Sequence, residues 1–164
     1  MGWAAFLDAC VLEEVRRNLA ADQRCTGEKA DSLMAIMNDA FPEASVEGYE
    51  GLIPAMTNHA SDRHILAAAV VAKADVIVTD NMRHFPMAAC EPYGLEVQTA
   101  DEFLSFSFDL APGAMGAAFL QQVADWSRPT LDASAALSRL DARLPSFADR
   151  LRTLPDVRSA AGLR

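Results

Sequence analysis

Residues 75–79 (DVIVT) constrain the fold more than any other segment, because they are short, rich in β-branched side chains and bounded by polar residues. Such a segment is typical of a buried strand in a parallel sheet. Before it, Ser61 and Asp62 precede a long apolar run at 65–74, which predicts a helix with its cap and acidic first turn in place. After it, residues 94–99 predict a second strand, and the residues that follow predict another helix. This order of elements predicts an α/β fold with crossover connections.

The remaining segments extend this pattern toward both ends of the chain. Periodic apolar residues predict helices at 13–20 and 28–40, and residues 44–53 predict a short strand and turn. Beyond about residue 105, prolines separate Ala- and Leu-rich stretches that predict three short amphipathic helices and a tail, at 112–126, 130–143, 146–153 and 152–164. We therefore predict a sheet domain over 1–104 and a helical extension over 105–164 that packs on that domain or on a partner.

Charge and composition exclude several classes of protein. The 164 residues are 51% apolar and carry a net charge of −9, so the chain can bury a core but gains no nucleic-acid affinity from bulk charge. No run approaches the roughly 18 apolar residues that span a bilayer. The three cysteines are scattered without C-x-x-C spacing, which indicates neither a disulfide framework nor a zinc site. We expect a cytoplasmic protein that makes no membrane contact.

Four acidic residues lie where α/β proteins place their active sites, at the ends of strands and the starts of helices. Asp80 follows the strand at 75–79, Asp62 begins a helix, Asp8 interrupts an apolar run, and Glu14 lies on the first turn of the next helix. Each of three has an ordinary explanation: a helix N-terminal acid for Asp62, a plain turn for Asp80, and a surface ion pair for Glu14. Asp8 is harder to explain, because a lone buried carboxylate is costly unless a cation compensates it.

The motifs that contain these acids resemble those of the PIN-domain family, in particular its VapC-type toxin ribonuclease branch. The similar stretches are FLDACVL at 6–12, EEVRRNL at 13–19, DRHILAAA at 62–69, ADVIVTDNMRHFP at 74–86, GLEV at 94–97 and ADEFL at 100–104. The block from Asp62 to Pro86 is the most specific of them. The resemblance implies a three-layer α/β/α fold with a central, mainly parallel sheet, followed by C-terminal helices.

Two departures from the family pattern bear on the site. The family separates its first strand from the helix that carries the second acid, whereas here Leu12 runs directly into Glu13. A strand that ends at Leu12 leaves no residues to bring Glu14 beside Asp8, and a single helix through both would place them on separate faces. We therefore predict that a connecting segment is missing between Val11 and Glu13.

The second departure lies at the fourth acid, where many family members have Thr, any residue and then Asp. Here Asn81 holds the third position and Asp80 precedes it. Either Asp80 replaces the missing carboxylate, or Asn81 binds metal-bound water through its amide. Thr79 and Asn81 are also candidates to orient the carboxylates by hydrogen bonds.

The resemblance implies a ribonuclease that uses Mg²⁺ or Mn²⁺ to cleave RNA and leaves a 3′-hydroxyl and a 5′-phosphate. Asp8, Glu14 and Asp62 would hold the metal, with Asp80 as a fourth ligand or water-orienting group, because a cation relieves the repulsion between converging carboxylates. Basic residues beside these motifs are the candidates for binding RNA: Arg16, Arg17, Arg63, His64, Arg83 and His84. Arg16 and Arg17 also fit ordinary surface ion pairs.

The resemblance also implies partners. The family commonly forms homodimers, and its toxin branch is inhibited by a cognate antitoxin. The alternative is a catalytically impaired PIN-fold protein that binds or regulates, which Asn81 and the missing segment favour. A flavodoxin-like ligand-binding domain fits less well, because no Gly-rich phosphate loop follows any predicted strand.

Overall fold

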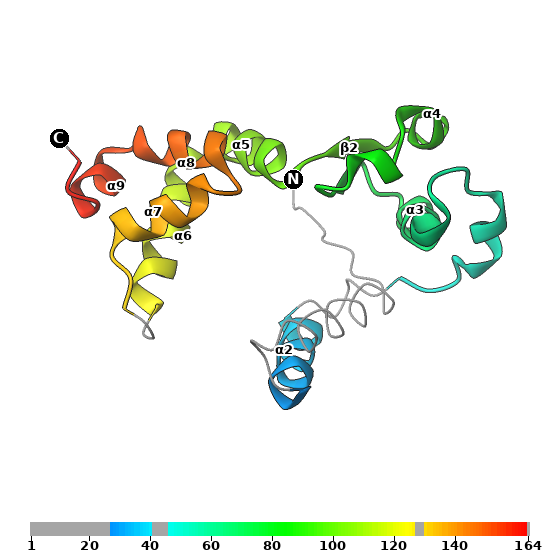
Figure 1. The fold of residues 1–164 in the computed structure, drawn as a ribbon, viewed down its shortest axis with the longest axis horizontal. Coiled ribbons are helices and arrows are strands. Elements are labelled where there is room, and N and C mark those ends of the chain that lie inside the picture. The colour runs from blue at the N-terminus through cyan, green and yellow to red at the C-terminus, as the bar shows by residue number, and fades with distance from the viewer. Residues whose placement is uncertain (1–26, 41–45, 127–129, 164) are drawn as a thin grey trace. The chain divides into compact units, whose positions relative to one another are not determined.

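The structure is a computed structural model that describes residues 27–40, 46–126 and 130–163 (Figure 1). The chain divides into two compact units, one of residues 1–77 with 83–97 and one of residues 78–82 with 98–164. The described part of each unit holds its own hydrophobic core. The predicted helix at 13–20 and the apolar segment around Asp8 lie outside the described residues. The predicted division at residues 104 and 105 stays a prediction.

Helix α2, Gly27–Ala40, confirms the helix predicted at 28–40. The sequence predicts an apolar stripe on it that includes Leu33 and Ile36, and both of these side chains are exposed, Ile36 by 62%. The helix therefore forms where its periodicity predicts it, although these two stripe residues are not part of a core.

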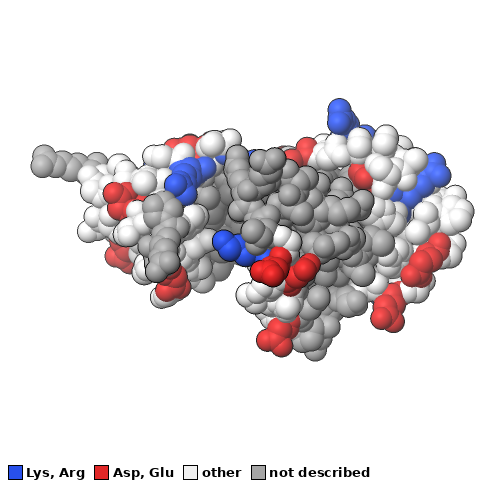
Figure 2. Space-filling model, turned by 60° about the horizontal axis from the view of Figure 1, so that its bottom comes forward, with Lys and Arg blue, Asp and Glu red and all other residues white. Residues whose placement is uncertain are grey.

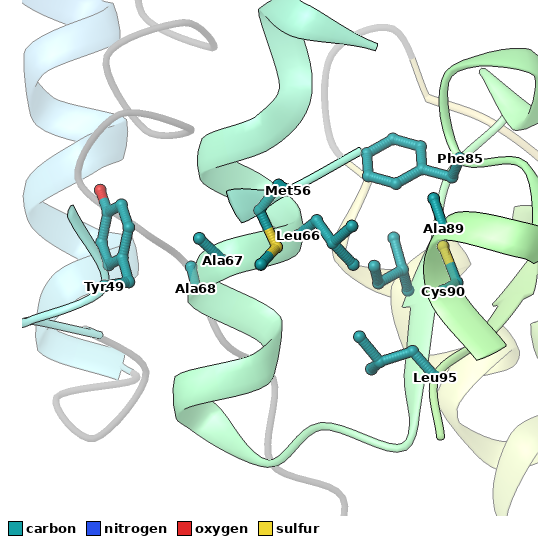
Figure 3. Packing of buried hydrophobic residues seen from close by; sticks show 10 residues of the cluster. Tyr49, Met56, Leu66, Ala67, Ala68, Phe85, Ala89, Cys90 and Leu95 are labelled. Atoms are coloured by element: carbon teal, nitrogen blue, oxygen red, sulfur yellow. The ribbon is translucent and has the colours of Figure 1, made fainter. Parts of the chain in front are cut away.

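Helix α3, Arg63–Ala72, is the centre of the first unit. It confirms the predicted apolar helix, and its buried residues Leu66, Ala67 and Ala68 form the middle of a core that extends to Phe85 and Leu95 (Figure 3). The helix begins two residues before its apolar run, directly after the 3₁₀ turn η3, Ala60–Asp62. Asp62 is its N-cap residue but makes no side-chain capping hydrogen bond, so the predicted side-chain cap is wrong. The helix ends at Ala72, and the C-cap residue Lys73 has a left-handed backbone with φ of 53° and an N–H that bonds back into the last turn.

A pair of parallel strands follows α3: β1, Val76–Val78, and β2, Glu96–Gln98. Glu96 N donates to Asp75 O at one end and Thr79 N donates to Gln98 O at the other, so both strands advance in the same direction. These strands confirm the two predicted at 75–79 and 94–99 and, with the helices, the mixed α/β class. Between them lie the short turns η4, Met82–His84, α4, Met87–Cys90, and η5, Glu91–Tyr93.

The strand predicted at 44–53 is wrong for the residues that the structure describes. From Glu50 to Ala55 the chain forms a 3₁₀ helix, η2, which packs against α3. Leu52 N donates to Tyr49 O, and Pro54 lies inside the element. Proline has no N–H to give to a sheet ladder, and Ile53 beside it packs against the core from this turn.

The second unit is a group of helices around a core of its own (Figure 1). They are α5, Ala100–Leu110, α6, Pro112–Asp125, α7, Ala133–Asp141, α8, Pro145–Arg152, and α9, Pro155–Ala160. Helices α6, α7 and α8 confirm the three predicted amphipathic helices. Gly116 allows α6 to approach α9 closely, because a Cβ at this position would collide with Leu154 Cδ1.

The tail predicted at 152–164 is wrong. Residues Pro155–Ala160 form α9, and Val157 in it is fully buried in the core of the second unit. A single strongly buried residue in a six-residue helix leaves no periodic pattern to detect, which is why sequence reasoning missed it.

Polar residues fix where the helices of the second unit begin. Thr99 and Glu102 form a reciprocal capping box at the start of α5. Asp101 reaches across to α8, where its carboxylate accepts hydrogen bonds from Ser146 N at 3.1 Å and Phe147 N at 2.8 Å. Burial alone would raise the pKa of Asp101, but these hydrogen bonds and the charge of Arg150 lower it below the ordinary value of 3.8.

The Asp101 contact yields a testable pH dependence. Because its pKa is lowered in the folded state, the ionised carboxylate stabilises the fold above pH 3.8, and this contribution is lost as the pH falls through the folded pKa. We expect Asp101→Ala to lower the free energy of unfolding by about 1 kcal/mol at pH 7, as the loss of a helix cap does. Urea denaturation followed by circular dichroism at pH 7 and pH 3 should show the difference from wild type shrinking in acid. Asp101→Asn, which keeps an acceptor but no charge, should lose less, and a deficit that is the same at both pH values would contradict the assignment.

None of the described helices is by itself long and apolar enough to cross a membrane. Helices α5 and α6, which meet at an angle of 119°, reach the required length and composition only as a pair.

Candidate active site

The start of α3 gathers the polar side chains of the first unit around the carboxylate of Asp62. Ser61 Oγ donates to Asp62 Oδ1 at 2.7 Å. On the other oxygen, His84 Nδ1 lies 2.7 Å from Asp62 Oδ2, and both side chains are less than one-fifth exposed. His84 comes from η4, 22 residues further along the chain. Hydrogen bonds from η3 and from η4 therefore hold both oxygens of this carboxylate.

Two histidines lie beside this carboxylate, and one of them donates a hydrogen bond to it. A carboxylate can only accept, so His84 carries its proton on Nδ1. Ser61 gives its hydroxyl proton to Asp62. His59 Nδ1 accepts from Ser61 N at 3.4 Å and lies 2.8 Å from Ser61 Oγ, so His59 contacts the serine that holds Asp62. The two imidazole rings stack with centroids 3.8 Å apart and planes 10° from parallel, and His59 N donates to His84 O. Asp62 is thus held directly by Ser61 and His84, and His59 packs against His84.

The environment keeps Asp62 ionised. Burial would raise the pKa of Asp62, but the hydrogen bonds from Ser61 and His84, together with the charges of His84 and His59, lower it below 3.8. An anionic oxygen donor held in a fixed position is what a hard divalent cation or a proton-accepting role requires.

Asn58 lies beneath this group and was not singled out from the sequence. Its side chain is buried, and its Nδ2 donates to the carbonyl oxygen of Asp62 at 3.0 Å. Its backbone oxygen accepts from Arg63 Nε at 3.5 Å. Asn58 and His59 form the loop side of the site, and their position four and three residues before Asp62 is the only sequence signal that could have identified them.

Asp80 lies in the second unit, on the loop that follows β1. Its Oδ1 is 3.5 Å from Ala100 N at the start of α5, a position that favours a negative charge. Thr79 Oγ1 accepts from Asn81 N at 3.1 Å, so the threonine stabilises the turn that carries Asp80. The predicted role of Thr79 and Asn81 in orienting the carboxylates stays a prediction.

The complete four-acid site is not tested by this structure. Asp8, Glu14, Arg16 and Arg17 lie outside the described residues, as does the predicted gap near residue 12. Asp62 and Asp80 belong to different units, and their convergence stays a prediction. Within the described ranges, no group of three or more His, Cys, Asp or Glu side chains could hold a metal ion.

Of the predicted RNA-binding residues, Arg63 and His64 follow Asp62 and are partly buried. Arg83 is exposed and precedes His84 on η4. Figure 2 shows acidic and basic side chains interspersed over the described part of the face it draws. On the described part of that face the basic side chains do not gather into one patch.

Comparison with known proteins gives the family. Over 116 residues the chain is 41% identical to a protein of Mycobacterium tuberculosis named "Putative ribonuclease VapC50", an alignment that covers 71% of this chain and 69% of that protein. The chain belongs to the VapC-type branch of the PIN-domain family. Residues 100–153 also match the family model described as the VapC50 C-terminal domain. No solved structure matches the chain.

VapC-type membership confirms the resemblance drawn from the motifs, and the family model adds what the motifs did not show. The matched residues 100–153 correspond to helices α5 to α8, of which only the start of α5, residues 100–104, belongs to the stretch on which the resemblance was based. The segment that forms α5 to α8 is therefore similar to a described family domain, and α9 lies beyond the matched residues.

Proposed function

We propose that this protein is a metal-dependent endoribonuclease that hydrolyses RNA phosphodiester bonds, and that it is the toxin of a type II toxin–antitoxin pair. The observation that carries the proposal is Asp62, an ionised carboxylate held by Ser61 and His84 at the start of α3. The name of the VapC50 relative supports ribonuclease chemistry for it.

Asp62 suits Mg²⁺ or Mn²⁺, because these ions prefer oxygen donors and because its pKa is lowered. We propose that Asp62 holds the ion together with Asp8, Glu14 and Asp80. A bound ion would lower the pKa of a water and stabilise charge on the phosphate. The chain's own residues do the positioning: His84 and Ser61 fix the Asp62 oxygens, and Arg63 and Arg83 are proposed to bind RNA phosphates.

The proposal includes the architecture and partners that the family implies. We propose that the α/β part completes a three-layer α/β/α PIN fold with a central, mainly parallel sheet. We also propose that the protein acts in the cytoplasm as a homodimer, under the control of an antitoxin.

A catalytically impaired binding or regulatory protein is the second candidate. It is favoured by Asn81, which replaces the fourth acid of many family members. Both oxygens of Asp62 also accept hydrogen bonds from the protein, so a metal ion would have to share or replace them.

Metal removal separates the two candidates. Incubation of the full chain with a fluorescent single-stranded RNA and Mg²⁺ should give cleavage products with 5′-phosphate ends, and excess EDTA should abolish them. Re-addition of Mn²⁺ should restore cleavage, and calorimetric titration with Mn²⁺ should show binding. Cleavage that survives EDTA would contradict the metal-dependent proposal, whereas Mn²⁺ binding without cleavage would support the impaired candidate.

A further inference from the structure

A shallow cleft lies on the second unit between α5 and α8, and the proposed RNA chemistry makes no use of it. Its volume is about 320 Å³. Four residues of α5 and two of α8 line it: Glu102, Ser105, Phe106, Asp109, Ser146 and Arg150.

Ser105 is the feature of this cleft that points to a ligand. The residue is 6% exposed, and its Oγ is shielded from water with no hydrogen-bond partner among the described residues. A buried hydroxyl without a partner destabilises a folded protein. The next serine on the same helix shows the usual solution, since Ser107 Oγ donates to the carbonyl of Phe103 at 2.8 Å. The unpartnered Ser105 hydroxyl therefore lowers the stability of the fold, and it lines the cleft as a polar group that a ligand could bind.

The charges of the cleft favour a cation. Asp109 and Arg150 neutralise each other through two hydrogen bonds of 3.0 and 3.1 Å. The carboxylate of Glu102 accepts both capping bonds from Thr99 through Oε2, which leaves Oε1 without a partner among the residues that the structure describes. Asp101 adds a second negative charge beside Ser146. Arg150 is thus already paired, and the charge left over is negative.

Phe106 gives the cleft an apolar wall. The residue is 49% exposed, and an exposed aromatic face attracts a cation and covers the methylene stem that carries it. Among biological cations, a guanidinium fits this combination best, because it is planar and has five donors to share between a carboxylate and a hydroxyl. To reach such a group, the Ser105 hydroxyl would rotate about the Cα–Cβ bond into another staggered position.

We propose that the cleft between α5 and α8 binds an arginine side chain of a partner polypeptide. In the complex the guanidinium stacks on Phe106 and donates hydrogen bonds to Glu102 Oε1 and Ser105 Oγ. The site is independent of the proposed ribonuclease chemistry, because none of its residues belongs to the four-acid set.

An NMR titration tests the proposal with the full chain and the tripeptide acetyl-Gly-Arg-Gly-amide. Saturable shifts are expected for the backbone amides of Glu102, Ser105 and Ser146, and none for the same peptide with citrulline, which is neutral and of nearly the same shape. Glu102→Gln keeps the capping box, since glutamine serves in it as well as glutamate, and should weaken binding about tenfold by removing the charge. Asp156→Asn removes one exposed negative charge of the same unit outside the cleft and should change the affinity less than twofold.

Ser105→Ala separates a ligand-binding role from a structural one. Removal of an unpartnered buried hydroxyl should raise the melting temperature by about 3 °C and weaken peptide binding about threefold. Equal binding of the citrulline peptide, equal affinities of the Glu102→Gln and Asp156→Asn variants, or a fall in melting temperature on Ser105→Ala would each overturn the proposal. So would shifts at these amides caused by an RNA oligonucleotide but not by the arginine peptide.

Discussion

Asp62→Asn is expected to keep the fold and to slow RNA cleavage by at least about 100-fold at saturating Mg²⁺. A metal ion contributes several kcal/mol to catalysis, and each 1.4 kcal/mol is a factor of ten in rate. The substitution removes the negative charge that the ion needs but preserves the shape of the side chain. The oxygen of the new amide can still accept from Ser61. Its nitrogen can donate to His84 Nδ1 when the His84 proton is on Nε2. The loss should therefore reflect the missing charge and not a collapsed site.

Single-turnover cleavage of a labelled RNA measures this loss, with circular dichroism as the check on folding. Asp75→Asn is the matched control, because it makes the same chemical change in the same unit at an exposed residue. That variant should cleave within about twofold of wild type, as surface substitutions away from a site usually have small effects. A folded Asp62→Asn variant that cleaves within threefold of wild type would remove Asp62 from the reaction.

The elements that sequence reasoning identified correctly have a local pattern strong enough to determine their structure. Helix α3 has an uninterrupted apolar run, and β1 has consecutive β-branched residues between polar ones. In α6, α7 and α8 the prolines and the Asp132 cap fix the starts. Each of these signals acts within a few residues, so no knowledge of the tertiary structure is needed.

The elements that were missed depend on contacts from elsewhere in the chain. Helix α9 exists because Val157 enters a core built by the other helices of its unit. The turn η2 packs against α3, with Ile53 partly buried in it and Met56 buried directly after it, although its own pattern fits a strand. In both, burial of a few side chains outweighs a weak local preference.

The candidate site shows the same division. Asp62 was identified from a motif, because helix starts and acidic residues are visible in a sequence. The contacts that His59 and Asn58 make around Asp62 were not identified, because neither the type nor the spacing of these two residues distinguishes them from ordinary loop residues. The stacked rings of His59 and His84 belong to residues that lie 25 positions apart in the sequence, and only folding brings them together.

Leu151→Ala is expected to cause the largest loss of stability, about 2–5 kcal/mol in the free energy of unfolding. Leu151 on α8 is fully buried in the core of the second unit, where α8 packs against α5 and α7. Alanine would leave a cavity there, and the surrounding helices can close it only in part.

Urea denaturation measures the loss, with Leu110→Ala as the control. Leu110 on α5 is 61% exposed, and its truncation should lower the free energy of unfolding by less than about 0.5 kcal/mol. Since whole domains are stable by only about 5–15 kcal/mol, the Leu151 variant should also weaken arginine-peptide binding, because the cleft between α5 and α8 exists only while these helices stay packed. Equal stability of the two variants would mean that α8 is not held by this core.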